Sequence, residues 1–157
     1  MSWSAKIRRT PLRLATGAFI FDSGIDHLKV DEETQGQLHE MAAGTYPFLR
    51  KVDPRLFAKA LAVGELAVGG LLLAPIVPPG LAGLALTGFA GGLVGLYART
   101  PGLRRERSVF PTQRGLGYAK DSWLCSIGIS LFADGALENA AITNKLGSAS
   151  HSDSAAA

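Results

Sequence analysis

Two long apolar runs joined by a proline-rich turn occupy the middle of the chain, at residues 56–77 and 81–98 around PIVPPG. The first run contains two charges, Lys59 and Glu65, and the second contains none. At about 1.5 Å of rise per residue, a helix of this length approaches the roughly 30 Å thickness of the bilayer hydrocarbon core. A soluble core helix would also show a polar stripe, and the second run offers only Thr87. The pattern predicts a transmembrane helical hairpin.

The composition indicates one small membrane domain. Hydrophobic residues make up 47% of the 157 residues and the mean hydropathy is only +0.19, so apolar spans must alternate with polar connections. The net charge of +3 comes without any recognisable nucleic-acid fold, and we interpret the basic residues as loop charge. Because Cys125 is the single cysteine, no disulfide can form within the chain.

Residues 14–28 and 118–137 are weaker candidates for membrane spans. The first follows a basic start at residues 1–13 and lacks a small-x-small cleavage site, so we predict a retained span rather than a signal peptide. Asp22 and Asp26 oppose its insertion if they face lipid. The second carries Trp123, which suits a membrane interface, with Asp134 near its far end.

The connection at residues 31–54 separates the first two predicted spans. Asp31 is placed to cap a helix whose first turn carries Glu32 and Glu33, with an apolar face that includes Leu38 and Met41. We predict an amphipathic segment that lies on the membrane or on the mouth of the bundle and is followed by an aromatic turn, and a solvated loop is the alternative. Residues 139–157 have little to bury and are predicted to be a disordered tail.

Several segments resemble the DoxX family of small bacterial membrane proteins, in its actinobacterial branch. They are RLATGAFIFDSG at 13–24, GELAVGGLLL at 64–73, the glycine-rich third span and KDSWL at 120–124. The resemblance covers roughly residues 12–138 and implies an all-α, four-helix bundle at 14–138 that crosses the plasma membrane. Members have been linked to quinone-coupled sulfur oxidation and to assemblies that handle thiol or oxidative stress. This chain differs from redox-active members in having no cysteine pair.

Small residues recur every four positions along the third span. Gly83, Thr87, Gly91 and Gly95 share one helix face, and Gly88 with Gly92 forms an adjacent ridge. Lipid supplies no hydrophobic drive between helices, so close van der Waals contact must hold them together. We predict packing within the chain, with a seam between copies in a homo-oligomer as the alternative.

Ionisable residues at membrane depth form the candidate site. Asp22 and Asp26 are one helical turn apart, His27 adjoins them, and Glu65 lies within the second span. These residues predict a polar pocket for a quinone head group or another small polar ligand. In the alternative, Glu65 bonds a neighbouring helix and the aspartates sit near the lipid head groups. No metal site is predicted, since no fixed ligand spacing occurs.

Charge patterning gives conflicting predictions of orientation. Loops 29–55 and 99–121 hold most of the Lys and Arg, which favours cytoplasmic loops, whereas the basic residues before the first span favour the reverse. Two functions follow from the sequence. One is a non-catalytic subunit or scaffold that docks a membrane or soluble redox partner through RTPGLRRERS and DEET. The other is a small quinone- or proton-linked oxidoreductase component. We favour the first, because the sequence shows no redox centre.

Overall fold

The computed structural model describes residues 3–155, and within them all regular secondary structure is helical, which confirms the all-α prediction. In chain order the elements are α1 (Trp3–His27), α2 (Glu32–Thr45), the 3-10 helix η1 (Pro47–Lys51), α3 (Pro54–Leu73), α4 (Pro79–Arg99), α5 (Leu116–Ala119) and α6 (Asp121–Ala155).

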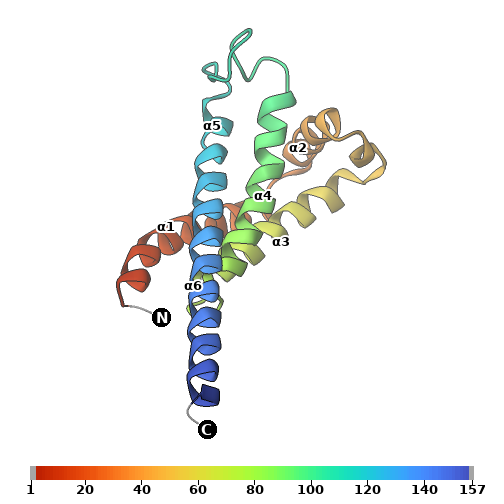
Figure 1. Ribbon diagram of the computed structural model, residues 1–157. Coiled ribbons are helices and arrows are strands. Elements are labelled where there is room, and N and C mark those ends of the chain that lie inside the picture. Colours follow the sequence, from red (N-terminus) through yellow and green to blue (C-terminus); the bar gives the residue numbers. More distant parts are fainter. Residues whose placement is uncertain (1–2, 156–157) are drawn as a thin grey trace.

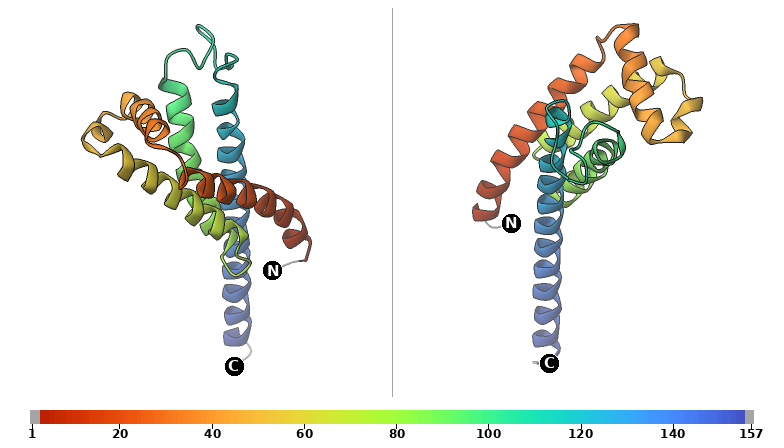
Figure 2. Two further views of the ribbon diagram at one scale, coloured as in Figure 1. Left: turned by 180° about the vertical axis from the view of Figure 1, so that it is seen from behind. Right: turned by 90° about the horizontal axis from the view of Figure 1, so that it is seen from above.

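The long helices form two antiparallel pairs. α1 packs along α3, and α4 packs along α6, while α3 also contacts α4 (Figure 1). The α1–α3 pair crosses the α4–α6 pair obliquely, and α6 extends past the other helices toward the C-terminus (Figure 2). Packing is therefore concentrated within each pair, rather than shared evenly around one bundle.

Two helices, α3 and α4, are long and apolar enough to cross a membrane by length and composition. They are the predicted hairpin. Only 33% of the most apolar window of α3 and 28% of that of α4 is buried, whereas the core helix of a soluble protein is mostly buried. Helices α1 and α6 do not meet the same criterion.

The ends of the hairpin follow from local chemistry. The Asp53 carboxylate accepts hydrogen bonds from the backbone N–H groups of Arg55 (3.0 Å) and Leu56 (3.1 Å), and Pro54 occupies the first turn of α3. α3 ends at Leu73, ahead of the first proline of PIVPPG, and the last of these prolines opens α4. Ile76 at the turn is 90% exposed.

The helix predicted after Asp31 is present as α2. The Asp31 carboxylate accepts from Thr34 N at 2.8 Å, and this backbone hydrogen bond holds the pKa of Asp31 below its usual value. α2 lies against α3 and also contacts α4. It buries Ala42 and Ala43, so the segment is folded rather than a solvated loop.

The predicted disordered tail differs from the structure. α6 continues as far as Ala155, and only residues 156–157 of the tail lie outside the described part. Residues 139–145 are exposed, as expected for a segment with little to bury. An established helix needs no new nucleation to extend, because each added residue contributes a hydrogen bond.

An arginine of α1 closes the end of α3. The Arg13 guanidinium donates to four carbonyl oxygens, those of Leu71 (2.9 Å), Leu72 (2.8 Å), Ala74 (2.7 Å) and Val77 (2.9 Å). The last carbonyls of a helix have no partner within it. One side chain thus satisfies the open end of α3 and the turn to α4.

A second arginine joins α1 to α6. Arg9 is only 5% exposed, and its guanidinium pairs with the carboxylates of Asp134 (2.5 Å) and Glu138 (2.6 Å). It also donates to the Asp134 carbonyl oxygen at 3.1 Å. Arg9 and Arg13 together are called the arginine clamps below. In the sequence these residues contribute to the charge pattern that bears on orientation. In the structure they hold α1 to the end of α3 and to α6.

Small residues do mediate the contact between α4 and α6, over a shorter stretch than predicted. A Cβ on Gly83 would lie 2.7 Å from the Gly128 carbonyl oxygen, and Gly80 packs on Gly135. Thr87 also faces Gly128. Close approach of the two backbones therefore depends on glycine in both helices.

The prediction is wrong for Gly88, Gly91 and Gly92, where an added Cβ would meet nothing within 4 Å, and Gly95 contacts Tyr46, which directly follows α2, instead of α6. A four-residue spacing drifts by about 40° per step around a helix of 3.6 residues per turn. The later glycines therefore rotate away from α6.

Gly83→Ala and Gly91→Ala form a matched pair that tests this interface. The Gly83 variant should lower the free energy of unfolding by about 1–3 kcal/mol, because the methyl group meets the α6 backbone. The Gly91 variant should be as stable as the parent or slightly more stable, since alanine favours the helix. Thermal unfolding in detergent, followed by circular dichroism, measures both. Equal stability of the two variants would contradict the interface.

Replacement of Arg13 by Met should lower the free energy of unfolding by roughly 3 kcal/mol, because several backbone carbonyls lose their donor. Arg13→Lys should recover part of the loss, as it keeps the charge but not the planar donor fork. Arg8→Gln is the control, since Arg8 makes only an exposed ion pair with Asp134. A stable Arg13→Met protein in the same unfolding assay would show that the clamp is dispensable.

Candidate functional site

A cavity of about 470 Å³ lies among the long helices, at the end of the molecule where α2 packs. Aromatic rings of Phe19, Phe57, Phe89 and Tyr118 contribute to its walls, and most of the remaining lining is aliphatic. Apart from the Tyr118 hydroxyl of α5, its polar side chains come from α1, α3 and the start of α6. An apolar cavity with a few polar groups is the usual form of a small-molecule site.

Glu65 of α3 provides the buried acid of the cavity. It is 5% exposed, and its Oε2 lies 2.6 Å from Nδ1 of His27. The Ser23 hydroxyl donates to Glu65 Oε1 at 3.1 Å. Ser23 and His27 are four residues apart on α1, so one face of that helix presents both groups to α3. We call Ser23, His27 and Glu65 the polar triad.

The polar triad can hold a proton in two ways. Either a neutral imidazole faces a protonated carboxyl, or an imidazolium faces a carboxylate, and the His27–Glu65 pair is uncharged overall in both cases. A net-neutral, hydrogen-bonded pair avoids the penalty of an isolated buried charge. The pair can therefore share one proton between its two side chains without leaving a net charge in the cavity.

Close contact between α1 and α3 brings the triad together. A Cβ on Gly24 would lie 2.9 Å from the Leu66 side chain and 3.0 Å from the Ala62 carbonyl oxygen. Only glycine allows this approach. Since Gly24 lies between Ser23 and His27, its missing side chain sets the distance from both to Glu65.

The structure brings together two of the four predicted site residues. His27 and Glu65 pair as described, whereas Asp22 and Asp26 are exposed and do not line the cavity. Their assignment to the pocket is corrected, because the inward face of α1 runs through Ile20, Ser23 and His27. The Asp26 carboxylate instead lies 4.0 Å from Lys29 Nζ. Both aspartates match the alternative of an outward position.

Sequence reasoning missed Ser23, Tyr118 and Asp121 as cavity residues. Ser23 could have been found from its four-residue spacing to His27. Asp121 opens α6 and lines the side of the cavity formed by Tyr118. No local signal connects Tyr118 and Asp121 with Glu65, because α6 reaches the cavity only through the packing of the two helix pairs.

Among residues 3–155, no three His, Cys, Asp or Glu side chains lie close enough to hold a metal ion. His39 is buried in α2, where Nε2 lies 2.9 Å from the Leu49 carbonyl oxygen and the ring stacks edge-on against Phe57. Cys125 is half-buried on α6.

Comparison of the chain with protein-family models, with curated proteins and with solved structures finds no match. The geometry of the cavity and the apolar character of the hairpin thus carry the functional argument.

A double-mutant cycle of Glu65→Leu and His27→Phe tests the polar triad. Each single change leaves a polar partner unpaired, so each should destabilise the protein by about 1–2 kcal/mol. The double variant should be more stable than the sum predicts, with a coupling of about 1 kcal/mol. Thermal unfolding in detergent gives all four values. Additivity within about 0.3 kcal/mol would mean that the two side chains do not interact.

Proposed function

We propose that the chain is a DoxX-like, multi-pass protein of the plasma membrane that binds a small amphipathic ligand, and that it serves as a non-catalytic subunit of a membrane redox or stress-response assembly. The observation that carries this proposal is the polar triad, buried against an otherwise apolar cavity.

Exposed apolar surface supports the membrane setting. Large hydrophobic side chains are exposed on each long helix, among them Phe19 of α1, Val63 of α3, Leu84 of α4 and Ile129 of α6. Water would leave this surface unfavourably solvated, whereas lipid covers it. We take α1 and α6 as the outer two of four spans, with Arg9 neutralised by Asp134 and Glu138. Exposed Asp22 and Asp26 then belong near the head groups at the α2 end.

The cavity suits a planar ring that carries oxygen acceptors. Its volume of about 470 Å³ falls within the usual range for small-molecule sites, and Phe19, Phe57 and Phe89 offer ring faces. His27 and Glu65 can donate or accept a hydrogen bond at a ring oxygen. A quinone head group has this chemistry, and the resemblance to DoxX proteins points to the same class.

A quinone-linked or proton-linked role in turnover is the second candidate, and the His27–Glu65 pair is the observation that favours it. Reduction of a quinone to the quinol consumes two electrons and two protons. The pair holds one transferable proton, so it would deliver the two protons one at a time and regain each from water, and the electrons would come from a redox partner in the assembly. Glu65→Gln separates the two candidates, because it keeps a hydrogen-bonding side chain but removes the exchangeable acid.

Binding of a short-chain benzoquinone tests the proposed site, by equilibrium dialysis of the detergent-purified protein against empty micelles. We expect saturable binding, about tenfold weaker in Glu65→Leu because a buried hydrogen bond to the ring oxygen is lost. Ala42→Leu should also weaken binding, since it fills the cavity beside the triad. Asp22→Asn is the matched control and should bind as the parent does, because Asp22 lies outside the cavity.

Glu65→Gln with normal binding and normal quinol formation in native membranes would support the non-catalytic role. Normal binding with lost turnover would support the proton-linked one. Parent protein that shows no saturable binding would refute the site.

A further inference from the structure

The connection between α4 and α5 is a loop ordered by its own hydrogen bonds and packing. Its two arms pair through Arg105 N to Phe110 O at 3.0 Å and Thr112 N to Leu103 O at 2.9 Å. Leu103 is 3% exposed and anchors the loop, and Gly115 packs directly against its backbone. Side chains that project from such a loop are held in defined positions.

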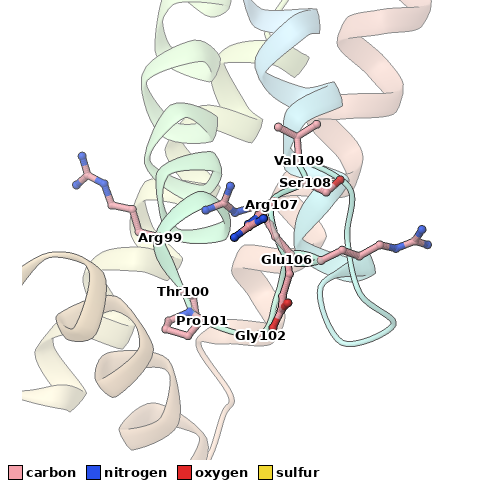
Figure 3. A pocket seen from close by; sticks show the side chains of 10 residues that line it. Arg99, Thr100, Pro101, Gly102, Glu106, Arg107, Ser108 and Val109 are labelled. Carbon is pink, nitrogen blue, oxygen red and sulfur yellow. The ribbon is translucent and has the colours of Figure 1, made fainter.

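Four arginines gather around a hollow of about 530 Å³ on this loop: Arg99, Arg104, Arg105 and Arg107. All four are exposed, and Glu106 is the one acidic residue in the lining. Figure 3 shows Arg99 at the end of α4 and Arg107 across the loop from it. Residues 99–110 are called the basic loop below.

No acidic side chain forms a salt bridge with these arginines in the described part of the chain. Arg107 also has a φ of 54°, a left-handed conformation that side chains other than glycine and asparagine adopt at some expense. Strained residues concentrate at ligand clamps and switches. The basic loop thus carries positive charge that no described acidic side chain pairs with, although the Arg105 Nε does donate to Pro111 O at 3.1 Å.

Apolar side chains stand directly beside the charges. Val109 is 73% exposed and Phe110 is 66% exposed, and the Tyr97 hydroxyl ties this corner to α4 by donating to Val109 O at 2.8 Å. A free phosphate ion or an acidic protein surface would match the arginines without using this apolar corner. A phospholipid matches both, with its phosphate at the guanidinium groups and its glycerol and upper acyl region at Val109 and Phe110.

We propose that the basic loop binds the phosphate head groups of anionic phospholipids, in the leaflet that surrounds the α2 end of the molecule. The proposal rests on the membrane location proposed above, since Arg99 ends α4 and thereby sets the loop at a bilayer surface. It also assigns the orientation. Anionic lipids and basic loops are both enriched on the cytoplasmic side, so the basic loop and α2 face the cytoplasm and both termini face outward.

Lipid titration followed by native mass spectrometry tests the proposal. Protein in a neutral detergent is titrated with phosphatidylglycerol or phosphatidylcholine, and bound lipid is counted. We expect a preference of tenfold or more for phosphatidylglycerol. The variant R104Q/R105Q/R107N should lose about fivefold in affinity per arginine, which corresponds to about 1 kcal/mol each. Asparagine at 107 tolerates the left-handed backbone, so the fold is kept. Lys59→Gln, on the exposed face of α3, is the matched control.

Three outcomes would overturn the proposal: equal binding of the two lipids, an unchanged phosphatidylglycerol affinity in the triple variant, or complete competition by millimolar inorganic phosphate, which would indicate a free-anion site. Tighter binding of polyglutamate than of phosphatidylglycerol would also overturn it, in favour of an acidic protein partner. Alkaline carbonate extraction of native membranes is run in parallel. Protein released by carbonate refutes the membrane location itself, whereas retained protein without lipid preference refutes only the lipid site.

Discussion

Satisfaction of the backbone at the end of α3 is the constraint on which the architecture depends. The last carbonyls of a helix have no partner within it, and the prolines of PIVPPG cannot donate a hydrogen bond to them. Arg13 supplies the missing donors from a different helix, so the hairpin is completed only when α1 docks on it. The same contact between α1 and α3 brings His27, which lies about 21 Å further along α1 than Arg13, next to Glu65. Closure of the turn and assembly of the polar triad therefore depend on the same contact between α1 and α3.

Features that follow from local chemistry could be predicted from the sequence. The two apolar runs became α3 and α4, Asp31 caps α2, and Glu65 is buried next to His27. The first two features depend on residues within one element. The third depends on a charged residue that stands alone within an apolar helix. The burial of Glu65 needed no knowledge of its neighbours.

Features set by the neighbouring helix could not be predicted. Periodicity showed that Asp22 and Asp26 share a face of α1, but not that α3 meets the face of Ser23 and Gly24. Periodicity also placed Gly91 in line with Gly83, but it did not show over what length α6 lies against α4. The arginine clamps were missed for the same reason: the carboxylate partners of Arg9 lie more than a hundred residues away, and the carbonyl partners of Arg13 lie 58–64 residues away.

The two helix pairs are held by charged hydrogen bonds at one end and through α2 at the other. The arginine clamps lie at the turn between α3 and α4, whereas the cavity lies at the opposite end, where α2 and the start of α6 cover it. The arginine clamps thus fix the two helix pairs at one end, and the pairs can separate at the cavity end. Separation of the two helix pairs at the cavity end would loosen the contacts of α2 with α4 and leave every hydrogen bond of the arginine clamps intact. A ligand would then exchange through the α2 end, and the grip on it would be set by how tightly α2 seats.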